Sequence, residues 1–116
     1  MKLAIRVPVG LPAHETAEFI QRCEDAGFSG VGVVDHQHSG RDVFMTLALA
    51  AQCTSTISLF PAVTNPISRH AMVLASVAHT LEEMAPGRVC LPVGAGFLAM
   101  HNINRRSATV REMRTV

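Results

Sequence analysis

The stretch ISLFPAVTNPISRHAMVLASVAHTLEEMAPGRVCLPVGAG (57–96) contains one complete strand–helix–strand unit. Its first part, 57–63, is a short apolar run with β-branched side chains, which is typical of a strand. A helix that Ser68 can cap follows, and its apolar face is formed by Ala71, Leu74, Ala75, Ala78 and Leu81. The Pro-Gly pair at 86–87 stops this helix, and 89–93 (VCLPV) form a second strand. The stretch therefore predicts two strands of one sheet joined by a helix.

The same alternation extends on both sides of this unit. We expect strands at 3–9 and 30–34, helices at 15–26 and from Asp42, and a last helix that begins near Ser107. The run GVGVV at 30–34 is apolar throughout, which indicates a strand buried on both faces, as in a parallel sheet. The order β-α-β-α-β-α-β-(α) predicts an α/β fold with right-handed crossovers. The pattern alone fits either a doubly wound sheet or a barrel.

Composition restricts the class of protein. The chain has 116 residues, the size of one domain, and a formal net charge of +1. This near-neutral charge gives no indication of a nucleic-acid partner. The sequence contains no apolar run of the roughly 18 residues that a membrane helix needs. Cys23, Cys53 and Cys90 lie in apolar runs without a CxxC spacing, so we expect reduced thiols in a cytoplasmic protein.

Four segments follow directly after the predicted strands, and three of them are polar or glycine-rich. They are 9–11 (VGL), 35–38 (DHQH), 64–66 (TNP) and 94–96 (GAG). In parallel α/β folds, ligands bind beyond the carboxyl ends of the strands. The sequence therefore predicts a ligand site formed by these segments.

The segment 35–38 carries the most reactive side chains. His36 can act as a proton donor, or as a hydrogen-bond donor to a bound ring, because imidazole titrates near neutral pH. Alternatively, His36 and His38 on an extended chain can bind one metal ion, although zinc needs three or four such ligands. A third interpretation is a polar loop in which Asp35 only caps nearby backbone. The sequence leaves these alternatives open.

The segment Gly94-Ala95-Gly96 gives a weaker indication. Glycine lets a ligand approach the backbone closely, but GxG also occurs in ordinary tight turns. The third glycine of a dinucleotide-binding fingerprint is absent. Arg69 and Arg88 flank the helix after Ser68, and we expect both to be structural or solvated rather than ligand-binding.

These segments together resemble the luciferase-like monooxygenase superfamily, and most closely its deazaflavin (coenzyme F420)-dependent methylenetetrahydromethanopterin reductases. The matching stretches are AGFSGVGVVDH (26–36), LALAAQCTSTISL (47–59), 62–96 and REMRTV (111–116). The most specific is VTNPxxRH, followed by a helix, a Pro-Gly-Arg turn and a strand that ends in GxG.

The resemblance implies an oxidoreductase that transfers hydride through F420, or alternatively FMN, to or from a small-molecule substrate. The chain would be the N-terminal half of a TIM (βα)8 barrel, with about four βα units in one partial domain, 1–116. It implies a cis peptide bond at Ala62-Val63 in a bulge behind the cofactor ring. His36 would be the catalytic residue. The cofactor-binding residues would be Asp35, His36, Ala62, Val63, Thr64, Asn65, Gly94, Ala95 and Gly96, with no metal.

Two features depart from the family pattern or complicate it. Phe60 stands where the family has glycine, and Pro92 removes a hydrogen-bond donor from a predicted interior strand.

Four βα units cannot close a barrel, so we expect Val33, Leu59 and Val93 to face water. Open edges and apolar patches then favour a homo-oligomer or pairing with a second half-barrel chain. A non-catalytic truncated remnant or interaction module remains an alternative, and a metal-dependent hydrolase using His36 and His38 is a weaker one.

Overall fold

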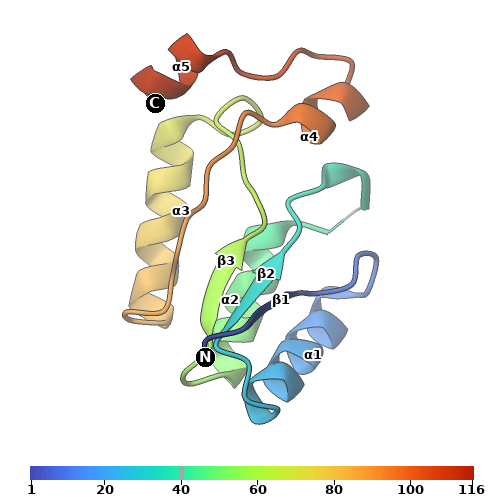
Figure 1. The fold of residues 1–116 in the computed structure, drawn as a ribbon, viewed down its shortest axis with the longest axis vertical. Helices are drawn as coiled ribbons and strands as arrows, with labels where there is room; N and C mark the ends of the chain where they lie inside the picture. Colours follow the sequence, from blue (N-terminus) through green and yellow to red (C-terminus); the bar gives the residue numbers. More distant parts are fainter. Residues whose placement is uncertain (40) are drawn as a thin grey trace.

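A computed structural model describes residues 1–39 and 41–116 (Figure 1). Strands β1 (Ala4–Arg6), β2 (Gly30–Val33) and β3 (Ser58–Pro61) alternate with helices α1 (Ala13–Asp25), α2 (Val43–Cys53) and α3 (Ala71–Met84). A 3-10 turn, η1 (Gln37–Ser39), follows β2, and two short helices, α4 (Phe97–Asn102) and α5 (Val110–Thr115), complete the order. The predicted alternation of strands and helices is confirmed.

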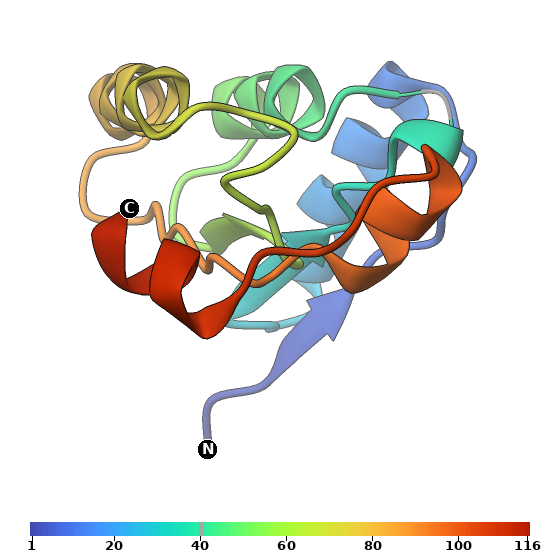
Figure 2. The ribbon, with the colours of Figure 1, turned by 90° about the horizontal axis from the view of Figure 1, so that it is seen from above.

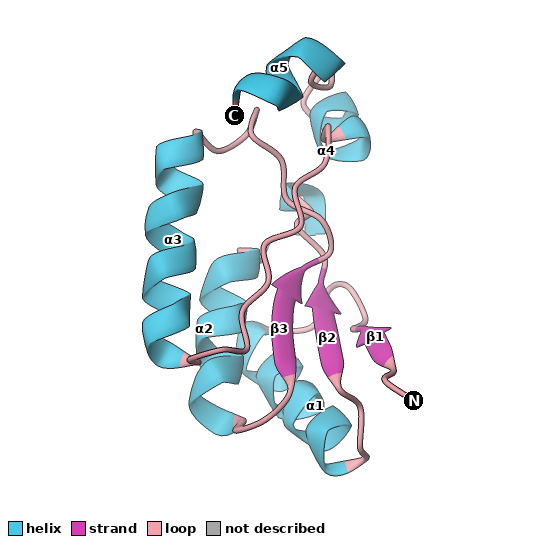
Figure 3. Ribbon diagram, turned by 60° about the vertical axis from the view of Figure 1, so that its left-hand side comes forward, coloured by secondary structure: helices cyan, strands magenta, loops and turns pink. Residues whose placement is uncertain are grey.

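The described strands form one parallel sheet in the order β1-β2-β3. Its register places Ile5 beside Val31 and Val31 beside Leu59. The helices α1, α2 and α3 lie on one side of the sheet, whereas its other face is left open in the view from above (Figure 2). The helices α4 and α5 lie beyond the carboxyl ends of the strands (Figure 3). The predicted α/β fold with a parallel sheet is confirmed.

The hydrophobic core lies between the sheet and the helices. Val33 is 7% exposed and Leu59 is fully buried, so the prediction that these two side chains face water is wrong. Side chains alternate across a strand, and the set Val31, Val33 and Leu59 points toward α1 and α2 rather than toward the open face. Val93 is 37% exposed, as expected.

The predicted fourth strand lies beside β3 but is held only near its two ends. Near one end, Leu59 N–H donates to Arg88 O (2.8 Å) and Cys90 N–H donates to Leu59 O (3.1 Å). Near the other, Gly94 N–H donates to Thr64 O at 2.8 Å. A regular ladder would next use the N–H groups of residues 61 and 92, and both are prolines, which have none. The two prolines explain why no continuous strand forms at 89–93.

Between these two attachments, the chain that continues β3 has one residue more than the segment beside it, and it forms a bulge. The bridge Leu59–Val89 and the bridge Thr64–Val93 lie five positions apart on the β3 side and four on the other. The peptide bond Ala62-Val63 within this stretch is cis, as the family resemblance predicted. The bulge brings Thr64 to the end of the sheet.

The structure tests the two predicted helix-capping residues, and one of them is correct. Asp42 caps α2 as predicted, since its carboxylate accepts the N–H groups of Phe44 and Met45 at 2.9 Å. The prediction that Ser68 caps the next helix is wrong: α3 begins at Ala71, and His70 Nδ1 accepts Met72 N–H at 3.1 Å. Ser68 instead donates its backbone N–H to the side chain of Asn65 at 2.8 Å.

The last helix and the stretch before it also differ from expectation. The helix expected near Ser107 begins at Val110, after a capping box between Thr109 and Glu112. Helix α4 was not predicted. None of the described helices is long and apolar enough to cross a membrane.

The loop before β3 is held at the amino ends of the strands. Glu24 accepts the backbone N–H groups of Ser55, Thr56 and Ile57 at 2.8–3.1 Å. Arg88 donates to Thr54 Oγ1 (2.9 Å) and to Ile57 O (3.1 Å), so it is structural, as expected. Burial opposes ionisation of Glu24, but the three backbone donors outweigh it and lower the pKa of Glu24 to about 2.

Candidate functional site

A pocket of about 360 Å³ opens at the carboxyl ends of the strands. The predicted site residues in its wall are Asp35, His36, Ala62, Val63, Thr64, Gly94 and Gly96. These residues come from three separate segments, which the parallel strands and the bulge bring together. Asn65 and Ala95 do not line it. Asn65 is buried behind the wall, and Ala95 is exposed.

Asp35 is the polar centre of the pocket wall. Its side chain is only 2% exposed. Its Oδ2 accepts the hydroxyl of Thr64 at 2.7 Å and the guanidinium of Arg69. Its Oδ1 accepts the side-chain N–H of Gln37 at 3.1 Å. Asp35 therefore ties the end of β2 to the segment after β3, and its hydrogen bonds hold Thr64 at the pocket.

Arg69 links this centre to the start of α2. Besides Asp35, it donates to Asp42 Oδ2 at 2.9 Å, and its guanidinium lies 5.0 Å from the ring centroid of Phe44. Burial opposes the shift, but hydrogen bonds and charge from Asp35 and Asp42 raise the pKa of Arg69. Burial likewise opposes ionisation of Asp42, but Met45 N–H, Arg69 and Phe44 N–H lower the pKa of Asp42. Arg69 is structural, as the sequence predicted, and it compensates the charge of Asp35.

His36 is held from above by α4. Asn102 Nδ2 lies 3.2 Å from His36 Nε2. Because an amide nitrogen can only donate, His36 Nε2 accepts this hydrogen bond, and the neutral ring carries its proton on Nδ1. This contact defines which nitrogen of His36 can act as a donor.

Asn65, which lies behind the pocket wall, packs against Gly96 of the wall. Asn65 Oδ1 accepts the N–H groups of Ile67 and Ser68, which shapes the turn after the bulge. Its Nδ2 is buried without a hydrogen-bond partner among the described residues. Gly96 has a φ of 76°, in the left-handed region, and is the N-cap residue of α4.

The metal alternative finds no support in the geometry. The rings of His36 and His38 lie edge to face with centroids 5.9 Å apart. Among residues 1–39 and 41–116, no three His, Cys, Asp or Glu side chains are placed to hold one ion.

The sequence analysis missed six residues of this site. The pocket is also lined by Arg6, Val34, Phe97, Leu98 and Ala99, and Asn102 contacts His36. The signal for Arg6 was present, since it is the only charged side chain within the predicted strand 3–9. Nothing local marked the residues of α4, because their positions depend on how α4 folds over the strand ends.

The model of the luciferase-like monooxygenase family matches residues 2–114. The chain belongs to this family. The resemblance inferred from the sequence is therefore confirmed.

Among curated relatives, a 5,10-methylenetetrahydromethanopterin reductase of Methanolobus tindarius is 38% identical over 85 residues, which are 73% of this chain and 26% of the relative. An F420-dependent hydroxymycolic acid dehydrogenase of Mycobacterium tuberculosis is 36% identical and covers 77% of this chain and 26% of its own length. The chain thus spans about a quarter of the length of these relatives.

A solved structure shows the same fold. The coenzyme F420-dependent tetrahydromethanopterin reductase of Methanopyrus kandleri superimposes with a TM-score of 0.82 at 30% identity, over 89% of this chain and 30% of that structure. An FMN complex of a Pseudomonas putida Baeyer-Villiger monooxygenase gives a TM-score of 0.72 at 16% identity, a likeness of fold alone.

Proposed function

We propose that this chain forms the first part of an oxidoreductase that binds coenzyme F420 at the pocket between Asp35, the 62–64 bulge and Gly94–Gly96. The observation that carries this proposal is the convergence of those three segments on one cavity. The F420-dependent relatives support F420 over FMN. The substrate would be a small molecule that exchanges hydride with the ring.

The pocket lining fits a flat polycyclic ring. Ala62, Val63 and Leu98 provide an apolar wall, and Gly94 and Gly96 expose backbone to the cavity. A bound deazaflavin supplies the hydride chemistry. The protein's own part is to hold the ring and exclude water from one face of it.

His36 and Thr64 would orient the ring and its reaction partner. The imidazole of His36 lies in the pocket wall, where the contact between Asn102 Nδ2 and His36 Nε2 (3.2 Å) positions the ring. Thr64 Oγ1 donates its proton to Asp35, so this oxygen can still accept a hydrogen bond. We therefore assign His36 as the proton or hydrogen-bond donor and Thr64 as an acceptor at the polar edge of the ligand.

We further propose that residues 1–116 form one partial domain with four βα units of a (βα)8 barrel. Its support is the parallel order of β1 to β3 with the segment 88–94 beside β3. Large apolar side chains around the pocket are exposed, among them Val63 (49%), Phe97 (76%) and Leu98 (61%). A second copy or a second half-barrel chain would cover them.

Analytical ultracentrifugation tests this association. A concentration-dependent rise in mass is expected, and a substitution such as Phe97→Ser reduces it. A single monomeric species up to about 100 μM would reject the pairing.

Cofactor binding is tested by titrating the purified chain into F420 and, separately, FMN, while following fluorescence anisotropy. Gly94→Val should weaken F420 binding, because a β-carbon at Gly94 already lies 3.3 Å from Val63 Cγ1 on the pocket wall. Ala95→Val is the matched control, since Ala95 lies outside the pocket. The proposal fails if neither cofactor binds, which would favour a non-catalytic remnant, or if both variants behave alike.

A further inference from the structure

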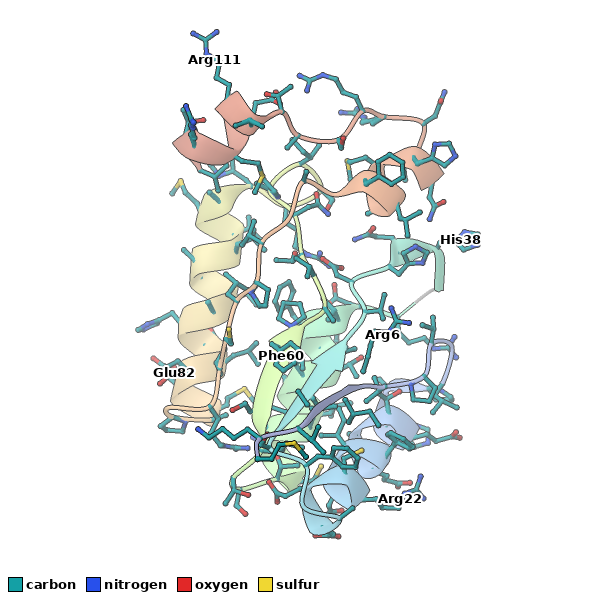
Figure 4. All side chains as sticks on the ribbon, viewed as in Figure 1. Arg6, Arg22, His38, Phe60, Glu82 and Arg111 are labelled. Atoms are coloured by element: carbon teal, nitrogen blue, oxygen red, sulfur yellow. The ribbon has the colours of Figure 1, made fainter. Side chains whose placement is uncertain are left out.

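Arg6 places a cation on the open face of the sheet. It is the last residue of β1 and pairs in register with Gly32 of β2, which in turn pairs with Phe60 of β3. Residues paired across neighbouring strands point to the same face. Arg6 therefore extends over the face opposite the helices, in a row with Phe60, and it lines the candidate pocket (Figure 4).

The neighbours of Arg6 on this face offer it no anion. A β-carbon at Gly32 would lie 2.7 Å from the Phe60 ring and 2.9 Å from Ala62 Cβ, so the space above Gly32 is filled by apolar groups. Within residues 1–39 and 41–116, Arg6 forms no hydrogen bond and no ion pair. Its guanidinium is thus a cation beside an apolar floor.

The acidic side chains near the pocket are bound to Arg69 and not to Arg6. Asp35 is the acidic residue of the wall, and it pairs with Arg69, which stands behind the wall. Asp42 shares the same arginine. Arg6 is therefore the cation of the wall that has no carboxylate partner among the described residues, and an anionic ligand can pair with its guanidinium.

We propose that Arg6 binds a carboxylate of the substrate, so that the pocket selects organic acids. The planar guanidinium can donate two parallel hydrogen bonds to a carboxylate. The apolar side chains of Ala62, Val63 and Leu98, which line the same pocket, would accommodate the adjoining carbon skeleton. This inference rests on the proposed function for the pocket, but it concerns the substrate and not the cofactor.

The experiment compares benzoate with its uncharged analogue benzamide. Each is titrated into the ¹⁵N-labelled chain while NMR follows the Arg6 Nε–H signal and the amides of Thr64, Gly94 and Gly96. Benzoate should shift these signals saturably and bind at least about tenfold more tightly than benzamide. Arg6→Gln should remove this preference, and Arg6→Lys should keep part of it.

The control variant is Arg22→Gln, which removes an arginine from α1 that lies over Phe19, away from the pocket. Benzoate affinity should be unchanged in it. The inference is overturned if benzoate and benzamide bind alike, or if folded Arg6→Gln binds benzoate as the wild type does. It is also overturned if benzoate never perturbs Arg6 because a carboxylate of a second chain occupies it.

The F420 titration separates this result from the proposed function. Benzoate selectivity without F420 binding removes the proposed cofactor and leaves Arg6 as an anion site. F420 binding without benzoate selectivity supports the proposed cofactor and rejects Arg6 as a carboxylate site.

Discussion

A β-carbon on Gly96 would lie 2.8 Å from Cγ of Asn65, closer than two carbons can approach. Gly96 also has a φ of 76°, which costs a residue with a side chain about 1–2 kcal/mol. Gly96→Ala therefore combines backbone strain with a steric clash against a buried side chain.

Gly87→Ala provides the matched control for that variant. Gly87 has a similar φ of 72°, but nothing lies within 4 Å of its β-carbon position. Urea unfolding should show a loss of about 1–2 kcal/mol for Gly87→Ala and about 1–3 kcal/mol more for Gly96→Ala. Equal losses would show that Asn65 moves aside without cost.

Arg69→Met should destabilise the fold strongly, because it leaves the buried carboxylate of Asp35 without its cation. Breaking one side of a buried ion pair costs about 3–5 kcal/mol. Asp42→Asn removes only the half-exposed partner and retains a good helix-capping residue, so its expected loss is below about 1 kcal/mol. Chemical denaturation of both variants tests the difference, and similar losses would contradict the assigned role of Asp35.

Glu24→Gln should remove a pH-dependent contribution to stability. The pKa of Glu24 is lowered from 4.5 to about 2 in the folded chain. A depressed folded-state pKa gives stabilisation that is present above the unfolded value and is lost as the pH falls through the folded value. The variant should lose about 1–2 kcal/mol at pH 7 and progressively less between about pH 4.5 and 2.

Glu18→Gln on the exposed side of α1 is the comparison for Glu24. It should change the free energy of unfolding little at any pH. If Glu24→Gln and the wild type differ by a constant amount across this range, the three backbone hydrogen bonds to the carboxylate are not what stabilises the loop at 54–57.

Asn102→Asp should reverse the tautomer of His36. A carboxylate only accepts, so the neutral imidazole would carry its proton on Nε2 instead of Nδ1. Two-dimensional ¹⁵N NMR of the histidine ring, recorded at about pH 8.5, distinguishes the two forms. His101→Ala on the same turn of α4 should leave the wild-type tautomer, and an unchanged ring in Asn102→Asp would exclude the contact.

The sequence predicted those features that depend on local chemistry. The periodicity of 43–53, the cap at Asp42 and the apolar run at 30–34 were interpreted correctly because neighbouring residues determine them. The cap of α3 was misplaced at Ser68, because the Asn65 side chain accepts the N–H of Ser68 in a local turn, for which the Asn-Pro pair at 65–66 was a signal. Similarly, the site segments were identified from strand ends, whereas Asn102 reaches His36 across 66 positions.

The orientation of the strands was the largest error of the sequence analysis. Val33 and Leu59 were expected on the open face, but alternation along β2 and β3 could equally place them toward the helices. The glycines at 30 and 32 decide the matter, since they leave room for Phe60 on the open face. An aromatic side chain opposite two glycines was a signal that the sequence contained.

The prolines at 61 and 92 affect how easily the segment 88–94 separates from β3 by local opening. The two hydrogen bonds missing between β3 and the segment 88–94 would need the N–H groups of residues 61 and 92. Because both residues are prolines, no backbone N–H is left without a partner in this gap. The segment 88–94 can separate from β3 by giving up only the few bonds at its ends. Leu59, Cys90 and Gly94 donate their N–H groups across this seam, whereas Ala62 donates to Val33 O of β2. Amide exchange at the first three should therefore be faster than at Ala62, which marks this seam as the first line along which the native chain opens.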